Sequence, residues 1–126
     1  MDTKNGLKLL LVDDDESSKL LLTMMMQPIS REILIASDGS EAVNTCKNHP
    51  DIDLIMMDIK MPVMNGLEAT RQIRQFNKNV IIIAQSAFDL SNEHEDALNA
   101  GCNAFIAKPI NRPTLLTAIE KLFSKV

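Results

Sequence analysis

The chain has 126 residues, of which 45% are hydrophobic and 24% are charged. A chain of this length can bury a core as one domain without disulfides or a structural metal. The formal net charge of −4, the small share of aromatic residues (3%) and the lack of a basic cluster argue against nucleic-acid binding by phosphate contacts or base stacking.

The start of the chain predicts neither a signal peptide nor a membrane span. Residues 1–6 are polar, and the apolar run that follows stops at three aspartates. We therefore expect a soluble, cytoplasmic protein. Cys46 and Cys102 have no second cysteine or histidine at ligand spacing, so we expect both to be reduced, small hydrophobic residues.

The first part of the chain predicts two strands, each followed by a helix. Residues 7–12 form an apolar run of strand length, and Ser17 or Ser18 can cap a helix that continues to about Gln27, where Pro28 stops it. We expect the methionines at 24–26 to fill the core on this helix. A second strand is predicted over 33–36 and a second helix over 40–47.

The rest of the chain repeats the alternation three times. An apolar run over 53–57 ends in Asp58, and an amphipathic segment over 67–74 follows it. Strands are predicted over 80–84 and 104–107. Between them, Ser91 or Asn92 is expected to cap a helix with Glu95 in its first turn and Gly101 at its end. Pro113 falls in the first turn of the last helix.

Continuous apolar strands joined by helices predict a parallel sheet covered on both faces, which is a three-layer, doubly wound α/β fold. In a parallel sheet all carboxyl ends lie at one edge, where ligands bind in open α/β sheets. Polar residues follow four of the five predicted strands, and we expect them to meet there: Asp13 and Asp14, Asp58, Ser86, and Lys108.

These residue types suit phosphoryl transfer. Carboxylates ~4 Å apart repel by about 4 kcal/mol per pair at an effective dielectric constant of 20, so such a cluster favours a cation. Mg²⁺ prefers one or two carboxylates with waters and a phosphate oxygen. Lys108 and the Ser86 hydroxyl can each bind a phosphate oxygen. Asp58 is then the candidate nucleophile, because a carboxylate can form an aspartyl-phosphate.

The motifs around these residues resemble the response-regulator receiver domain, the CheY-like family. The resemblance spans about residues 7–123 and rests on four stretches: Leu11-Val12-Asp13-Asp14-Asp15, Met57-Asp58-Ile59-Lys60-Met61-Pro62 with Asn65-Gly66, Ser86-Ala87, and Phe105-Ile106-Ala107-Lys108-Pro109. It implies a flavodoxin-like (βα)5 fold with strand order 2-1-3-4-5. It also implies one receiver domain over 1–126, with a core of about 7–124.

The resemblance assigns roles at the site. Asp58 would accept a phosphoryl group from a phosphohistidine, with Mg²⁺ held directly by Asp14, by Asp13 often through water, by Asp58 and by the main-chain carbonyl of Lys60. Mn²⁺ is a possible substitute. Lys108 would pair with the phosphate, and its bond to Pro109 is expected to be cis.

The resemblance also implies a switch. Ser86 stands at the family's Thr/Ser position and Phe105 at its aromatic position, and the output surface would be the face of the fourth helix, fifth strand and fifth helix. Lys60 and Phe88 lie where the family tunes phosphate lifetime. The chain departs from many relatives at Gln85, where they have a small or aliphatic residue, and by having Phe in place of Tyr at 105.

The expected partners are a sensor histidine kinase or a histidine phosphotransfer domain, and a downstream protein of unknown identity. Nucleic acid is not expected as a partner, nor does this chain itself predict a membrane contact. The motif over 57–70 is similar to receivers attached to hybrid sensor histidine kinases, although a free-standing regulator fits the same residues. The receiver would catalyse its own phosphorylation and dephosphorylation without being a conventional enzyme.

Two other readings remain open at this point. A phosphatase of the haloacid-dehalogenase type would use Asp13 as nucleophile, but Ser17 replaces its expected Thr or Val, no acidic pair follows Lys108, and Asp58 would have no role. A binding module that is never phosphorylated would be expected to lack Asp58, Asp14 or Lys108, and all three are present.

Overall fold

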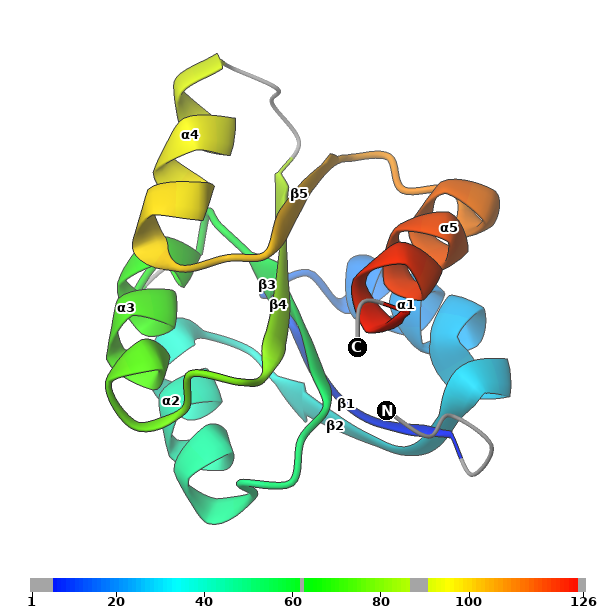
Figure 1. Ribbon diagram of the computed structural model, residues 1–126, viewed down its shortest axis with the longest axis horizontal. Helices are drawn as coiled ribbons and strands as arrows, with labels where there is room; N and C mark the ends of the chain where they lie inside the picture. The colour runs from blue at the N-terminus through cyan, green and yellow to red at the C-terminus, as the bar shows by residue number, and fades with distance from the viewer. Residues whose placement is uncertain (1–5, 62, 87–90, 125–126) are drawn as a thin grey trace.

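The computed structural model of the protein describes residues 6–61, 63–86 and 91–124. It contains one five-stranded parallel sheet in the order β2-β1-β3-β4-β5, with helices on both faces (Figure 1). The elements in chain order are β1 (Leu7–Val12), α1 (Glu16–Met26), a 3-10 helix (Gln27–Ile29), β2 (Ser30–Ala36), α2 (Gly39–Asn48), β3 (Leu54–Asp58), α3 (Gly66–Phe76), β4 (Ile81–Ser86), α4 (Ser91–Ala100), β5 (Ala104–Ala107) and α5 (Arg112–Phe123). The predicted fold class and strand order are confirmed.

Alternate residues of the central strands supply two separate cores. Leu10, Ile55 and Ile82 belong to a buried cluster with residues of α2, α3 and α4. Leu9 and Met56 belong to a second cluster with residues of α1 and α5. Figure 1 shows the same division, with α2, α3 and α4 on one side of the sheet and α1 and α5 on the other. The strands are buried on both faces because each contributes to both cores.

Three predicted details of the helices are wrong. The cap of α1 is Asp15, whose carboxylate accepts a hydrogen bond from the Ser18 amide at 2.8 Å, so neither Ser17 nor Ser18 caps it. The first described residue of α4 is already Ser91, and the acidic residue of its first turn is Glu93 rather than Glu95. Of the three methionines expected in the core, Met26 is buried but Met24 is 63% exposed.

The observed bounds of two strands also differ from the predicted ones. β4 extends two residues beyond the predicted end, so Gln85 and Ser86 are strand residues, and β2 begins at Ser30 rather than at residue 33. Cys46 and Cys102 are buried and unpaired, as predicted. No helix in the described part of the chain has both the length and the apolar character that a membrane crossing requires.

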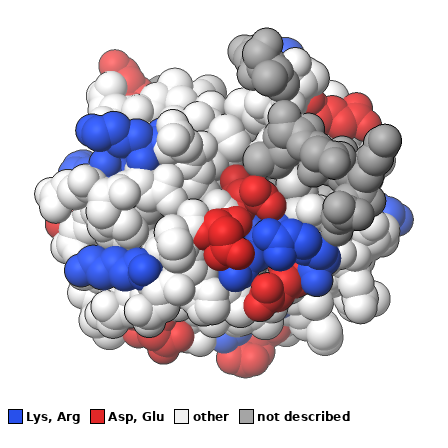
Figure 2. Space-filling model, turned by 60° about the horizontal axis from the view of Figure 1, so that its bottom comes forward, with Lys and Arg blue, Asp and Glu red and all other residues white. Residues whose placement is uncertain are grey.

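Lys8 is a buried cation in the middle of an apolar strand. Its Nζ lies 2.8 Å from Asp51 Oδ1 and 3.6 Å from Glu32 Oε1, and Arg31 reaches the other oxygen of Asp51 at 3.8 Å. On the face shown in Figure 2, acidic and basic side chains gather side by side near the middle. The charges of β1 and β2 at this end of the sheet are therefore neutralised within the chain.

Arg74 ties three segments together at the amino ends of β4 and β5. Its guanidinium donates to the carbonyls of Gly101 (2.9 Å), Asn77 (3.2 Å) and Val80 (2.8 Å), and to the side chain of Asn103 (2.9 Å). The half-buried guanidinium thus satisfies carbonyls at the end of α3, the start of β4 and the turn after α4. The sequence pattern predicted only an amphipathic segment over 67–74, and no role for Arg74.

We expect Arg74→Met to lower the free energy of unfolding by about 3 kcal/mol, because it removes several charge-assisted hydrogen bonds and leaves partly buried carbonyls without a donor. Urea unfolding followed by circular dichroism would measure the change. Arg71→Met on the same helix is the matched control, and it should change stability by less than about 0.5 kcal/mol, since the pair of Arg71 with Glu68 is exposed. Equal effects of the two substitutions would contradict the assigned role of Arg74.

Candidate functional site

Three carboxylates meet at the carboxyl edge of the sheet. Asp13 directly follows β1, and Asp58 is the last residue of β3. Parallel pairing aligns Val12 with Met57, which brings these two strand ends together. Carboxylate oxygens of Asp13, Asp14 and Asp58 all lie within 4.8 Å of one another. The predicted acidic cluster is therefore present, with Asp13 and Asp58 buried and Asp14 exposed.

The chain around Asp58 is held by backbone contacts. The amide of Ile59 donates to the carbonyl of Gln85 at 3.0 Å, and the amide of Gly66 donates to the carbonyl of Ile59 at 2.8 Å. A Cβ at Gly66 would collide with the carbonyl oxygen of Asp58. Asn65 caps α3 by accepting from the Glu68 amide at 3.0 Å. The Asn65-Gly66 pair thus lets α3 begin directly behind Asp58.

Lys108 is the cation of the cluster. Its Nζ donates to Asp13 Oδ2 at 2.9 Å and lies 3.8 Å from Asp58 Oδ1. Its amide donates to the carbonyl of Ser86 at 2.7 Å, which fixes the position of Lys108 beside the end of β4. The Lys108–Pro109 peptide bond is cis, as the family resemblance implied.

Asp13 uses both carboxylate oxygens within the chain. Oδ1 accepts from the Asp15 amide at 2.9 Å, and Oδ2 accepts from Lys108. The second contact partly neutralises Asp13, while the first holds the turn from which α1 begins. A nucleophile needs an oxygen that is free to attack, so this arrangement does not favour Asp13 as the acceptor that the phosphatase alternative required.

Burial raises the pKa of the Asp58 carboxyl to about 7, and the carboxylates of Asp13 and Asp14 act in the same direction. The ammonium of Lys108 and a hydrogen bond from the Lys60 amide oppose the rise. One lysine does not fully compensate the desolvation and repulsion. A divalent cation beside these oxygens would favour the ionised form of Asp58, and a set of hard carboxylate oxygens matches the ligands that Mg²⁺ prefers.

The predicted switch residues lie in the two strands beyond β3, Ser86 in β4 and Phe105 in β5. Ser86 is 1% exposed at the end of β4. Phe105 in β5 is half-buried, and its ring stacks on that of His94 in α4, with centroids 5.4 Å apart and planes at 17°. Phe88, expected to tune phosphate lifetime, lies outside the described residues.

Sequence reasoning missed the two α4 residues that contact the predicted site. His94 stacks on Phe105, and Glu93 Oε1 pairs with Lys60 Nζ at 3.0 Å. No motif marks either residue. No local signal could have found them, because both contacts depend on how α4 packs against β5 and the residue that follows the end of β3 by two positions.

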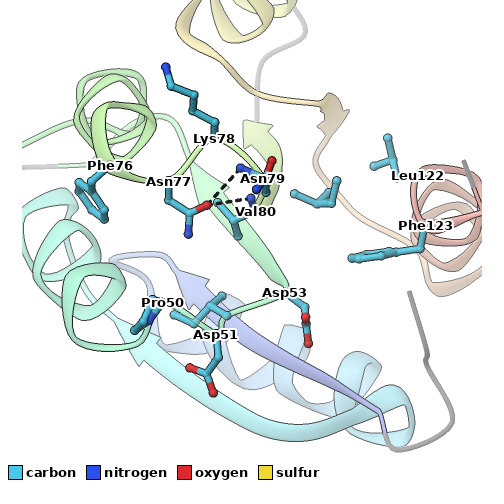
Figure 3. Close-up of a pocket in the computed structure, with 12 residues that line it drawn as sticks. Pro50, Asp51, Asp53, Phe76, Asn77, Lys78, Asn79, Val80, Leu122 and Phe123 are labelled. Carbon is cyan, nitrogen blue, oxygen red and sulfur yellow. Dashed lines mark hydrogen bonds between the residues drawn. The ribbon is translucent and has the colours of Figure 1, made fainter. Parts of the chain in front are cut away.

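A pocket of about 570 Å³ lies at the opposite end of the strands and contains none of the predicted site residues. Figure 3 shows Leu122 and Phe123 of α5 on one side and the segment from Phe76 to Val80 on the other. The Asn77 side chain accepts from the amides of Asn79 and Val80 there, at 3.2 and 3.0 Å. Because none of its lining residues belongs to the carboxylate cluster, this pocket is separate from the candidate site.

Comparison with known proteins gives concordant matches. The family model described as the response regulator receiver domain matches residues 9–120. The chemotaxis protein CheY of Halobacterium salinarum is 36% identical over 89 residues, covering 71% of this chain and 73% of that protein. A receiver domain of a sensor histidine kinase from Pseudomonas aeruginosa PAO1, solved with magnesium coordinated in its active-site cleft, has a TM-score of 0.85 and 32% identity, covering 95% and 99% of the two chains.

A chain from the co-crystal structure of the Saccharomyces cerevisiae histidine phosphotransfer protein Ypd1 with the receiver domain of Ssk1 matches as well. Its TM-score is 0.84 at 31% identity, and the match covers 92% of this chain and 88% of that chain.

The raised pKa of Asp58 predicts how stability depends on pH in EDTA. Between pH 4 and pH 7 the folded state keeps a proton that the unfolded chain releases, so this group lowers the free energy of unfolding as pH rises, by at most about 1.4 kcal/mol per pH unit. The Asp58→Asn variant has no carboxyl group at this position, so its free energy of unfolding should not fall with pH for this reason. In urea unfolding at pH 5, 6, 7 and 8, the free energy of unfolding of the variant should rise relative to that of the wild type as pH increases.

The exposed carboxylate of Asp96 offers the control for this measurement, because Asp96→Asn should track the wild type at every pH. A stability difference between Asp58→Asn and wild type that stays constant from pH 5 to 8 would contradict the raised pKa.

Proposed function

Because this chain belongs to the response regulator receiver domain family, we propose that Asp58 is its phosphoacceptor. Receiver domains are the phosphorylated modules of two-component systems. The observation that carries the proposal is the position of Asp58, which ends β3 between an acidic pair and the ammonium of Lys108. Asp13 and Asp58 are buried, whereas Asp14 is exposed. Both carboxylate oxygens of Asp13 accept hydrogen bonds, from the Asp15 amide and from Lys108, while Asp58 Oδ1 lies 3.8 Å from Lys108 Nζ.

In the proposed reaction, an oxygen of Asp58 forms a bond to the phosphorus of a phosphohistidine. The P–N bond breaks, and its electron pair returns to the imidazole ring of the donor. Lys108, 3.8 Å from Asp58 Oδ1, donates to one phosphoryl oxygen, and the Ser86 hydroxyl donates to another. The protein thus contributes a positioned nucleophile and donors for the transferred group.

The receiver family binds Mg²⁺ at its acidic site, and the three carboxylates here fit that ion. Asp14 and Asp58 would hold it directly with the carbonyl of Lys60, and Asp13 would hold it through water. When bound, the ion neutralises charge that develops on the transferred phosphoryl group. Mn²⁺ would be accepted as a substitute, because it has a similar preference for oxygen ligands.

The proposed switch links Asp58 to the face of α4, β5 and α5. Movement of the Ser86 hydroxyl toward the phosphoryl group would accompany an inward rotation of Phe105. That rotation would break the stack with His94 and alter the contact of α4 with β5. Phe105 has no hydroxyl, so the output cannot depend on a hydrogen bond from this ring. Lys60 and Phe88 would set the phosphate lifetime by shielding the site from water.

The proposed donor is a sensor histidine kinase or a histidine phosphotransfer domain. The yeast co-crystal of a phosphotransfer protein with a receiver domain supports this class of partner. We propose a cytoplasmic receiver that occupies residues 1–126 as one domain, with a core over 7–124. The similar proteins include a chemotaxis protein and a receiver of a sensor kinase, so both a stand-alone regulator and a hybrid-kinase module fit. No nucleic-acid partner is proposed.

The exposed side of α1 is the proposed docking face for the donor. Leu20, Leu21 and Met24 are 64%, 52% and 63% exposed, and helical spacing places them on one side of α1. The helix begins at Glu16, two residues after Asp14, with Asp15 as its cap, so α1 starts beside the acidic cluster. A phosphohistidine that comes within bonding distance of Asp58 requires its protein to cover the neighbouring surface, and an apolar patch there favours such contact.

Intact-mass spectrometry after incubation with acetyl phosphate and Mg²⁺ tests the phosphoacceptor. Wild-type protein should gain one phosphoryl group, and Asp58→Asn should gain none, because the nucleophilic oxygen is gone. Asp13→Asn should retain some modification at a reduced rate. Modification lost only in Asp13→Asn would favour the phosphatase alternative, and no modification in any sample would leave a binding module that is not phosphorylated.

Phosphotransfer profiling tests the docking face. Histidine kinases and phosphotransfer proteins of the source organism would be phosphorylated and mixed with this chain, and the fastest donor retained. With that donor, Leu20→Asp and Met24→Asp should slow transfer about tenfold or more, since a charge would be buried in the contact. Leu98→Asp, an exposed leucine on α4, is the control and should transfer normally. Unchanged transfer to both α1 variants would contradict the docking proposal.

A further inference from the structure

Gln85 is a fully buried polar side chain in the middle of the sheet. In β4 it lies opposite Asp58 on one side and Ile106 on the other. Alternation along β4 places its side chain on the same face as Ile83, toward α1 and α5. The residue is 0% exposed, and among the described residues neither the oxygen nor the nitrogen of its amide has a hydrogen-bond partner.

Such a side chain is costly, because each buried polar atom without a partner keeps its full desolvation penalty. A leucine would fill the same volume without that penalty. The described residues do not offer the amide a hydrogen-bond partner. A bound molecule that supplies both a donor and an acceptor would satisfy it.

A pocket of about 400 Å³ adjoins Gln85, between α1 and the segment that follows β5. Its lining is apolar except for Gln85, Lys108 and one serine, and the full set is Ser18, Leu21, Leu22, Met25, Gln85, Lys108, Pro109 and Ile110. Sites for small molecules are commonly of this size, largely apolar, and supplied with a few polar groups that fix orientation.

Charge and hydrogen-bonding capacity narrow the ligand. The Gln85 amide offers one donor group and one acceptor, which another amide complements through two hydrogen bonds. A carboxylate would meet repulsion from Asp13 and Asp58, and the ammonium that could offset this is already paired with Asp13 at 2.9 Å. An ammonium ligand would leave the Gln85 nitrogen without an acceptor. These constraints favour an uncharged amide on an apolar stem.

We propose that this pocket binds a small uncharged molecule that carries a carboxamide or lactam on an apolar stem, with Gln85 as its recognition residue. This ligand site is separate from the proposed phosphorylation site, because phosphorylation of Asp58 requires neither Gln85 nor an amide ligand. It shares Lys108 with the carboxylate cluster, so its occupant would lie beside the phosphoacceptor without contacting the acidic pair.

The test uses three ligands with the same stem: hexanamide, 2-heptanone, which replaces the amide nitrogen by a methyl group, and hexanoate. Each is titrated into ¹⁵N-labelled protein while backbone amide resonances are followed. Hexanamide should shift resonances of the pocket-lining segments 18–25 and 108–110 and bind about tenfold more tightly than 2-heptanone, as expected for one further buried hydrogen bond. Hexanoate should bind more weakly than both.

The matched variant is Gln85→Leu, with Gln85→Met as a second choice should the first fold poorly. Both should unfold at higher urea concentration than wild type, because the unpaired amide is gone. In either variant 2-heptanone should bind at least as tightly as hexanamide. Equal affinity of wild type for the two ligands, an unchanged preference in the variants, shifts located outside the pocket, or no shift at the solubility limit of hexanamide would each overturn the proposal.

Acetyl phosphate labelling of the same samples separates this inference from the proposed function. If the wild-type protein does not bind hexanamide but is labelled normally at Asp58, the ligand site is rejected and the phosphoacceptor is not. Amide binding in a protein that acetyl phosphate does not label would uphold the ligand site and reject the phosphoacceptor.

Discussion

Mutual repulsion of three carboxylates at one edge of the sheet is the constraint on which the site depends. A parallel sheet brings all strand ends to the same edge, so acids that follow β1 and end β3 cannot be separated. Lys108 compensates part of this charge from the end of β5. Burial, with the neighbouring carboxylates of Asp13 and Asp14, still raises the pKa of Asp58 against the effect of Lys108. A site that is short of positive charge is suited to a divalent cation, and a bound cation would favour the ionised form of Asp58.

Features that depend on local pattern were predictable from the sequence. Apolar runs, turns and caps located five strands and five helices, and parallel geometry then gathered Asp13, Asp58 and Lys108. The cap of α1 was not predictable, because Asp15, Ser17 and Ser18 can all accept from a helix amide and only packing selects one. The contact of His94 with Phe105 depends on how α4 packs on β5, which no spacing within either segment encodes.

The two ends of the sheet are stabilised in different ways. At the amino ends of β4 and β5, Arg74 satisfies several carbonyls at once, so the end of α3 and the turn after α4 are bound to the strands. At the carboxyl end, the contacts of α4 with the site among the described residues include the ion pair of Lys60 with Glu93 and the stack of His94 on Phe105. A helix whose carboxyl end is held by Arg74 can shift at its amino end, near Asp58, while the fold stays intact.

The contact of Lys108 with Asp13 also bears on the acidic cluster in the absence of a metal ion. Because an internal ammonium occupies one oxygen of Asp13 and a backbone amide occupies the other, the most buried acid of the cluster has partners before any ion arrives. The end of β1 and the start of α1 are therefore held in position without a metal ion at Asp13.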